Sequence, residues 1–265
     1  MRAISNTLAR LGIIALAIAG SLAFSGAASA ADWTWRFAPY VWVPSLGTDL
    51  EVNDQEISGG AEVTMEDVVD QLDFVGMAHF EGQSGRHGFL VDTLYANFGD
   101  EDVRVHPGGP LNGDVVVDGD LGVLLTEAAG LYNPAGDGSG WSLIYGVRVF
   151  DVDEDIEARY ELPAATRSRT YELGTTLWDG LVGARYIGSW GERWRYNLRG
   201  DVSGGGTELT WNTMAGVGYA WADGRHTLLG GYRYMQIELD EKDERAEVKS
   251  TITLNGPYFG YQLTF

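Results

Sequence analysis

Apolar and polar side chains alternate over long stretches of this chain, and residues 193–202 show the pattern most clearly. Every second residue there is apolar or small: Trp194, Tyr196, Leu198, Gly200 and Val202. The residues between them are polar or charged: Arg193, Arg195, Asn197, Arg199 and Asp201. A period of two is typical of a β-strand whose two faces meet different surroundings. Residues 178–190 and 209–221 repeat the pattern, with Trp or Tyr near their ends.

About ten segments of this kind follow one another: 33–52, 72–84, 86–99, 115–132, 141–160, 170–190, 192–204, 207–222, 225–241 and 248–265. Tight turns near Gly85, Gly191 and Gly224 separate some of them, and Asp-Gly at 223–224 is a strong hairpin signal. Longer or more polar connections separate others: 53–71, 100–114, 161–169 and 242–247. The long connection 133–140 and the short one at 204–206 break this alternation. We therefore predict an all-β, antiparallel up-and-down barrel of about ten strands, within a range of eight to twelve.

The chain ends on a strand pattern with no polar tail behind it. Phe259, Tyr261, Leu263 and Phe265 lie on one face of the last segment. Gly260, Leu263 and Phe265 match the Gly-x-x-apolar-x-aromatic ending of Gram-negative outer-membrane β-barrels, and the chain resembles that broad class. The resemblance implies a transmembrane barrel in the outer membrane, inserted by the barrel-assembly machinery and surrounded by outer-membrane lipid and lipopolysaccharide. Short turns face the periplasm in this class, and an even number of strands places both chain ends there.

The N-terminus has the pattern of a secretory signal peptide. Arg2 and Arg10 give a positive start, residues 11–22 are almost wholly apolar, and Ala28-Ser29-Ala30 is a small-x-small cleavage site. We predict cleavage after Ala30, so that residues 1–30 are the signal peptide and residues 31–265 the barrel domain. No later run of about 18 apolar residues predicts a membrane-spanning helix.

A soluble periplasmic barrel or sandwich is the main structural alternative. Such a protein would also alternate, but its exposed face should be polar. Here the outward face is apolar, with Trp and Tyr near the strand ends, where aromatic girdles meet lipid headgroups. This favours the membrane barrel.

Strand parity turns a set of charged residues toward the lumen. The predicted lumen-lining residues are Arg36, Asp73, His79, Glu81, Asp92, Asp118, Asp120, Arg148, Asp179, Arg185, Arg195, Arg199, Asp201 and Arg233. The lumen of a barrel of about ten strands is narrow and mostly filled by side chains. The charges could pair across the strands and plug it, or line a narrow polar path for small solutes. Both alternatives use the same residues.

His79 and Asp92 form the one candidate catalytic pair. If Gly85 and Arg86 make a two-residue turn, Ser84 pairs with His87, and His79 lies directly opposite Asp92. A carboxylate beside a histidine can orient it as a general base. A hydrolase also needs a nucleophile and an oxyanion site, and the sequence places no serine nearby. The alternative is an ion pair that fixes the register of this hairpin.

Acidic residues dominate the charge and gather near the predicted outer strand ends. The chain carries 18 basic and 38 acidic residues, a formal charge of −20. The outer clusters are Asp49, Glu51, Asp54 and Glu56; Asp100, Glu101 and Asp102; Asp151, Asp153, Glu154, Asp155 and Glu157; and Asp240, Glu241, Asp243 and Glu244. Such a rim repels nucleic acid and concentrates cations, so divalent cations could bind the acidic loops.

The sequence predicts no cofactor and no dedicated metal site. There is no cysteine, which excludes disulfides and thiolate ligands. Asp151-x-Asp153-x-Asp155 starts like a calcium loop, but Ile156 stands where glycine is needed and Leu162 where the closing glutamate should be.

These patterns predict an outer-membrane β-barrel with an acidic outer rim that acts as a structural or porin-like protein for small-solute passage. Two alternatives stay open: an outer-membrane enzyme that uses His79 and Asp92, and an adhesion or binding protein that acts through its acidic loops.

Overall fold

A computed structural model describes most of the chain after the predicted signal peptide. The described residues are 33–52, 55–56, 62–63, 72–99, 103–105, 114–162, 165–221, 224–243 and 246–265. The predicted signal peptide at 1–30 lies outside them. The described residues contain no helix long and apolar enough to span a membrane.

The described residues form strands connected by turns. The strands are β1 (Thr34–Trp42), β2 (Ser45–Val52), β3 (Gln55–Glu56), β4 (Glu62–Val63), β5 (Leu72–Ser84), β6 (His87–Gly99), β7 (Val103–Val105), β8 (Asp114–Tyr132), β9 (Gly140–Leu162), β10 (Ala165–Trp190), β11 (Trp194–Gly205), β12 (Leu209–Trp221), β13 (His226–Asp243) and β14 (Ala246–Thr264). Most bounds lie close to those predicted from the alternation of side chains.

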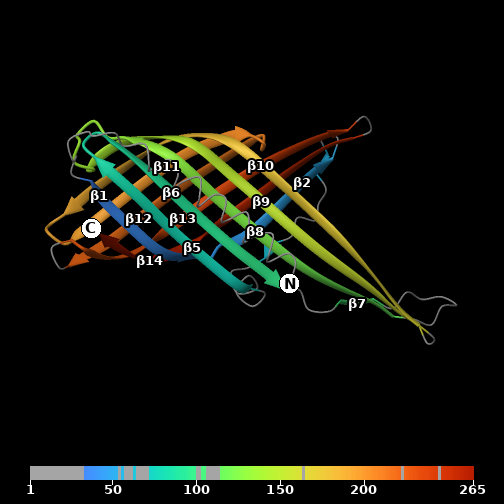
Figure 1. The fold of residues 1–265 in the computed structure, drawn as a ribbon. Coiled ribbons are helices and arrows are strands. Elements are labelled where there is room, and N and C mark those ends of the chain that lie inside the picture. The colour runs from blue at the N-terminus through green and yellow to red at the C-terminus, as the bar shows by residue number, and fades with distance from the viewer. Residues whose placement is uncertain are drawn as a thin grey trace, which may run out of the picture. The chain divides into compact units, whose positions relative to one another are not determined.

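Ten of these strands close into a barrel within the described residues (Figure 1). They pair antiparallel in the order β1-β5-β6-β8-β9-β10-β11-β12-β13-β14. The last strand then pairs with the first, with Arg36 opposite Thr264 and Tyr40 opposite Gly260. The predicted antiparallel barrel of about ten strands is therefore confirmed.

The predicted first strand is divided in two near Pro44. Proline has no N–H to donate to a strand ladder. β1 pairs with both β14 and β5, and its register with β5 ends at Tyr40 opposite Met77. β2 continues along β14 from Ser45 opposite Asn255, and on its other side it pairs with the short strands β3 and β4.

The connections at the two ends of the barrel differ. The turns 85–86, 133–139, 191–193 and 224–225 lie at the end where Phe265 finishes the chain, and we call it the tight-turn end. Gly85 takes a positive φ of 53° in the first of these turns, as the predicted tight hairpin requires. At the opposite end the predicted connection 161–169 is wrong, because Leu162 pairs with Ala165 and the β9–β10 ladder runs almost to its tip.

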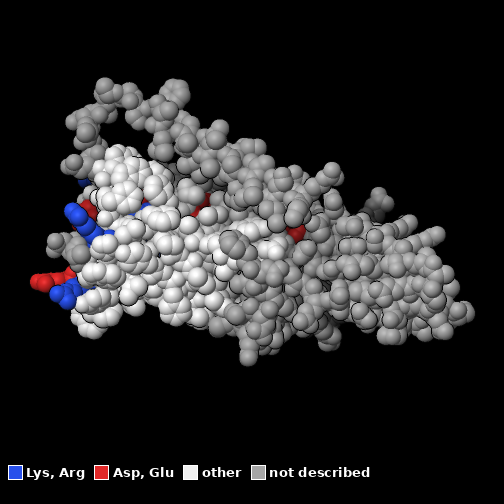
Figure 2. Space-filling view, turned by 60° about the horizontal axis from the view of Figure 1, so that its bottom comes forward, with Lys and Arg blue, Asp and Glu red and all other residues white. Residues whose placement is uncertain are grey.

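The outer surface of the barrel is apolar. Trp178 is 62% exposed, Leu198 52% and Val217 55%. Trp190, which is 79% exposed, closes β10 at the tight-turn end, while Trp178 lies twelve residues away along the same strand. On the face seen in Figure 2, charged side chains gather at this end, beside a broad uncharged surface. A soluble protein rarely exposes so large an apolar surface, whereas hydrocarbon accepts it.

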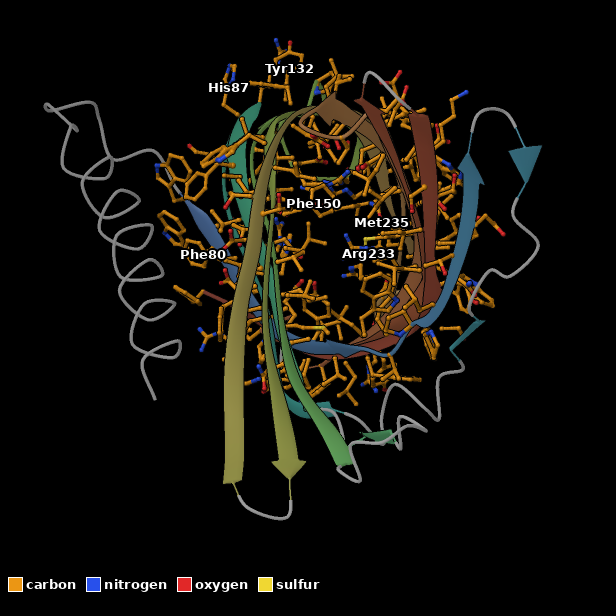
Figure 3. The ribbon with its side chains drawn as sticks, turned by 90° about the vertical axis from the view of Figure 1, so that its right-hand side faces the viewer. Phe80, His87, Tyr132, Phe150, Arg233 and Met235 are labelled. Atoms are coloured by element: carbon orange, nitrogen blue, oxygen red, sulfur yellow. The ribbon has the colours of Figure 1, made fainter. Side chains whose placement is uncertain are left out.

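The hydrophobic core lies inside the barrel. A cluster of buried apolar residues, which we call the apolar layer, crosses the lumen on the side away from the tight turns: Trp42, Met77, Leu94, Leu125, Phe150, Met235 and Ile237. Figure 3 looks along the barrel and shows Phe150 and Met235 pointing inward. Residues inside the wall are thus packed against one another as in the core of a soluble protein.

A charge on the lipid-facing surface should destabilise the barrel according to its depth. Leu198→Arg places a cation at the level of Ala215 in the middle of the wall, and should lower the free energy of unfolding by about 2–4 kcal/mol. Leu228→Arg, at an equally exposed site near the tight-turn end, should cost about 0–1 kcal/mol. Urea unfolding in lipid vesicles, followed by tryptophan fluorescence, measures both. Equal losses at the two sites would contradict this placement of the membrane.

Candidate functional site

Charged side chains from four strands, with an asparagine from a fifth, form a buried network across the lumen. This ion-pair layer consists of Glu127, Arg148, Arg199, Asp201 and Arg233 together with Asn212. Arg148 donates to Glu127 at 2.7 Å and to Asp201 at 2.5 Å. Arg199 donates to the second oxygen of each carboxylate, at 2.6 and 2.7 Å. Each of the two carboxylates in the layer is thus shared by at least two arginines.

The ion-pair layer reaches from one wall of the barrel to the other. Glu127 lies on β8 and Arg233 on β13, which are five strands apart in the closed order of ten. The Arg233 Nη2 atom lies 3.5 Å from a Glu127 carboxylate oxygen, so side chains from two opposite walls are in contact. The Arg233 guanidinium also lies over the Trp42 ring, 4.7 Å from its centroid. The ion-pair layer and the apolar layer therefore fill adjoining levels of the lumen.

A cavity of about 430 Å³ lies between the ion-pair layer and the tight-turn end. We call it the basin. It reaches the turns through Gly138, Ser189 and Gly224, and Arg199 and Tyr40 lie on its inner side. In the class that the sequence resembles, the tight-turn end faces the periplasm. The basin thus opens toward one aqueous side.

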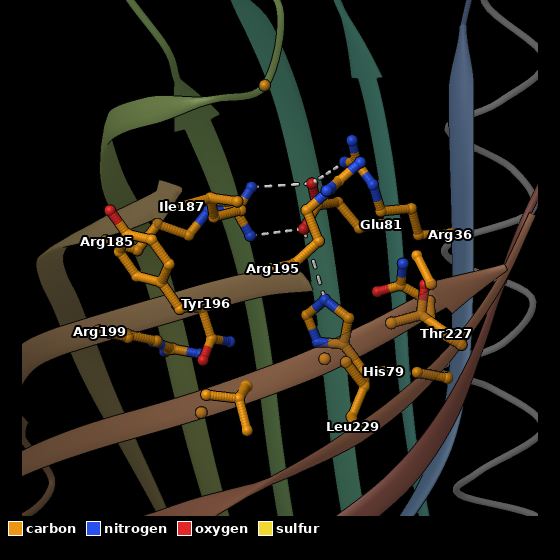
Figure 4. A pocket seen from close by; sticks show the side chains of 18 of the residues that line it. Arg36, His79, Glu81, Arg185, Ile187, Arg195, Tyr196, Arg199, Thr227 and Leu229 are labelled. Atoms are coloured by element: carbon orange, nitrogen blue, oxygen red, sulfur yellow. Dashed lines mark hydrogen bonds and ion pairs between the residues drawn. The ribbon is translucent and has the colours of Figure 1, made fainter. Parts of the chain in front are cut away.

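Glu81 is the centre of the charged cluster in the basin (Figure 4). It accepts hydrogen bonds from Arg36 Nη1 at 2.7 Å and from Arg185 at 2.5 and 2.8 Å. The Arg185 contact is bidentate and joins β10 to β5 across the lumen. Glu81 is only 2% exposed, so both its oxygens depend on these donors.

His79 lies between two carboxylates. The structure pairs it with Asp92 in the β5–β6 register, as the count from the Gly85 turn predicted. Its Nδ1 atom lies 3.0 Å from Asp92, and its Nε2 atom 3.5 Å from Glu81. Carboxylates only accept hydrogen bonds when ionised, so both ring nitrogens are in positions to donate. A general base needs a free lone pair, which this arrangement does not offer.

The predicted lumen-lining residues fall into three groups. Those buried inside the wall are Glu81, Arg148, Asp179, Arg185, Asp201 and Arg233, with Arg36, His79, Asp92 and Arg199 partly buried beside them. Arg195 is exposed at the mouth of the basin, where it donates to the carbonyls of Glu192 and Trp194. The side chains of Asp73, Asp118 and Asp120 lie outside the described part of the structure.

Asp179 stabilises a loop at the end of the barrel and, among the described residues, does not take part in the ion pairs of the lumen. It accepts hydrogen bonds from the backbone N–H groups of Gly206 and Thr207, at 3.0 and 2.8 Å, and from the Thr207 hydroxyl at 2.7 Å. These bonds explain why the connection at 204–206 can be short, since a buried carboxylate fixes its backbone.

The Asn133 side chain organises the long turn at the tight-turn end. It is fully buried, donates to the carbonyls of Ser139 and Trp141 and accepts from the N–H of Gly136 at 2.7 Å. Sequence reasoning noted the length of this turn but missed its organiser. It also missed Tyr40, which donates to Asp92 at 2.7 Å, although parity with Arg36 places Tyr40 on the inward face.

The predicted acidic rim can be examined only in part. Most of its side chains lie outside the described residues. Among the side chains that are described, no group of three or more His, Asp or Glu could hold a metal ion. Binding of divalent cations by the rim stays a prediction.

Comparison with known proteins yields distant structural likenesses. No protein-family model and no curated protein sequence matches the chain. The outer membrane protease OmpT from Escherichia coli is 9% identical with a TM-score of 0.47, over 91% of this chain and 99% of that one. The translocator domain of the autotransporter NalP from Neisseria meningitidis is 14% identical with a TM-score of 0.40, over 99% and 98%. Likenesses this distant carry no activity over to this chain.

The closed antiparallel barrel and its apolar outer surface identify the chain as an outer-membrane β-barrel, as the sequence predicted. Its interior holds the two filled layers and the basin.

Removing the charge of Glu127 should strongly destabilise the barrel. Glu127→Gln leaves Arg148, Arg199 and Arg233 with too little negative charge in a buried layer, and should lower the free energy of unfolding by about 3–5 kcal/mol. Glu192→Gln, in an exposed turn, is the matched control and should change it by less than about 0.5 kcal/mol. Urea unfolding in vesicles compares the two, and similar values would refute a structural role for the layer.

Proposed function

We propose that this protein is a closed outer-membrane barrel that serves as a structural scaffold for its basin, rather than a porin-like route across the membrane. The observation that carries the proposal is the contact between Glu127 and Arg233, which joins opposite walls of the lumen. The sequence left open whether the inward charges plug the lumen or line a path for solutes. The contact between Glu127 and Arg233 favours a plugged lumen.

Two further features support a closed lumen. Trp42, Phe150 and Met235 are 3%, 8% and 0% exposed, although they project into the space that a channel would occupy. Side chains that line a conducting pathway would instead be exposed to water. The basin ends against the ion-pair layer, so a solute that enters from the tight-turn end meets paired charges and then apolar side chains.

The enzyme and adhesion alternatives receive less support from the geometry. His79 has a carboxylate facing each ring nitrogen, and no described serine hydrogen-bonds to it. Adhesion would depend on the outer connections, most of whose side chains lie outside the described residues. The filled lumen is described directly, and it supports the closed barrel over a path for solutes.

Planar-bilayer recording tests the closed barrel. The folded chain should give no discrete current steps under a salt gradient, while an open porin reconstituted in parallel shows that the assay detects conduction. The double variant Trp42→Ala, Arg233→Ala removes the stacked pair that joins the two filled layers, and should raise the frequency of current steps.

A lipid-facing double variant provides the matched control. Trp221→Ala, Tyr232→Ala removes two aromatic side chains, 36% and 50% exposed, from the outer surface and should stay silent. Heat-modifiable migration in gels confirms that each variant is folded. Steps from the unaltered, folded chain as large as those of the interior variant would overturn the proposal and support small-solute passage.

A further inference from the structure

The carboxylates of the basin are already engaged by the barrel itself. Both oxygens of Glu81 accept from Arg185, and one also accepts from Arg36. One oxygen of Asp92 accepts from Tyr40, and the other faces His79 at 3.0 Å. Little acceptor capacity therefore remains in the basin for a cation or a hydrogen-bond donor.

Several arginine donors of the basin remain open by contrast. The Arg185 side chain is only 8% exposed, and its buried Nε atom has no hydrogen-bond partner among the described residues. A buried donor without a partner is rare and calls for an explanation. The Arg36 side chain is 22% exposed, and its hydrogen bond to Glu81 uses one of its five donors.

Arg195 adds a positive charge at the mouth of the basin. Its Nη1 atom donates to the carbonyls of Glu192 and Trp194, each at 3.1 Å, and no described carboxylate pairs with it. Asp137 also lines the basin, and it accepts from the N–H and hydroxyl of Ser139, which hold the pKa of Asp137 below its usual value. Arg195 is therefore free to pair with a charge that enters from the aqueous side.

Part of the basin wall is apolar. Leu90, Ile187 and Leu229 line it together with the arginines. Figure 4 shows Ile187 and Leu229 among them. A volume of about 430 Å³ falls in the range of small-molecule sites, about 300–1,000 Å³. A ligand that matched this wall would combine an acceptor-rich charged group with a compact apolar part.

We propose that the basin binds a small organic anion, with a carboxylate or phosphate group on Arg195 and Arg36 and its apolar body against Ile187 and Leu229. The fork of an arginine matches both groups in geometry, and charge-assisted hydrogen bonds to them are the strong ones. The open end of the basin admits the ligand, and the ion-pair layer holds it from passing further. This inference uses the scaffold role proposed above only in assigning the basin one aqueous side.

Calorimetric titration of the full folded chain in nanodiscs tests the site. The probes are phenyl phosphate and benzoate, with neutral benzyl alcohol as the control for the apolar body and inorganic phosphate as the control for the charge. Phenyl phosphate or benzoate should bind saturably and more tightly than either control. Arg195→Gln should weaken that binding about tenfold or more, because it removes a charge-assisted hydrogen bond.

Arg193→Gln is the matched control variant. Arg193 lies two residues from Arg195, but it donates to the lipid-facing Tyr219 at 2.9 Å and does not line the basin. Its affinity for the probes should equal that of the unaltered chain, and Arg195→Lys should retain more affinity than Arg195→Gln. The proposal is overturned by equal losses in the Arg193 and Arg195 variants, by benzyl alcohol binding as tightly as the anions, or by no saturable binding at millimolar probe.

Two sources could supply the anionic group, a free solute or the headgroup of a neighbouring anionic lipid. Nanodiscs of phosphatidylcholine alone and with phosphatidylglycerol separate them. Competition between phosphatidylglycerol and phenyl phosphate would identify the headgroup, and unchanged affinity would identify a soluble ligand; either result upholds an anion site. If the chain neither conducts nor binds the anions, the anion site is refuted and the closed barrel is supported. If it conducts and binds the anions, the closed barrel is refuted and the anion site is supported.

Discussion

The closure of ten strands into a narrow barrel is the constraint on which the rest of this structure depends. Closure satisfies every backbone group of the wall, but it leaves an outer face in hydrocarbon and an inner space that only the chain's own side chains can fill. Each strand must therefore carry two kinds of residue in strict alternation. Leu198 and Val202 meet lipid, while Arg199 and Asp201 between them meet the other walls.

This alternation explains how much the sequence could predict. Parity places Arg148, Arg185 and Arg233 inside the barrel without any knowledge of their partners, and the structure finds each of them buried. Turn chemistry adds register, since the two-residue turn at Gly85 fixes His79 opposite Asp92 by counting alone. Both inferences use local geometry, which reaches from a residue to its neighbouring strand and no further.

Contacts across the lumen lie beyond such local reasoning. Parity gives the face of a residue but not its height in the barrel, which depends on the stagger of all ten strands. The pairs Glu81–Arg185 and Glu127–Arg233, about 100 residues apart in the chain, could therefore not be assigned, and neither could the basin beside them. The β9–β10 ladder was missed for another reason, because polar side chains at 161–169 were interpreted as a loop although the backbone continues to pair.

The buried charges need an explanation other than stability, because well-packed apolar residues would often fill the same space at least as favourably. Register offers one. A slip of one residue between strands exchanges the two faces, so a slipped β11 would turn Arg199 into lipid. Each such cation near the middle of the membrane costs about 2–4 kcal/mol. A lumen filled only with leucine and valine would carry no such penalty, since both faces would suit lipid. The ion-pair layer therefore specifies the register of the barrel that the apolar layer fills. Where the ion-pair layer ends, toward the tight turns, arginine donors are left without partners in the described part of the basin.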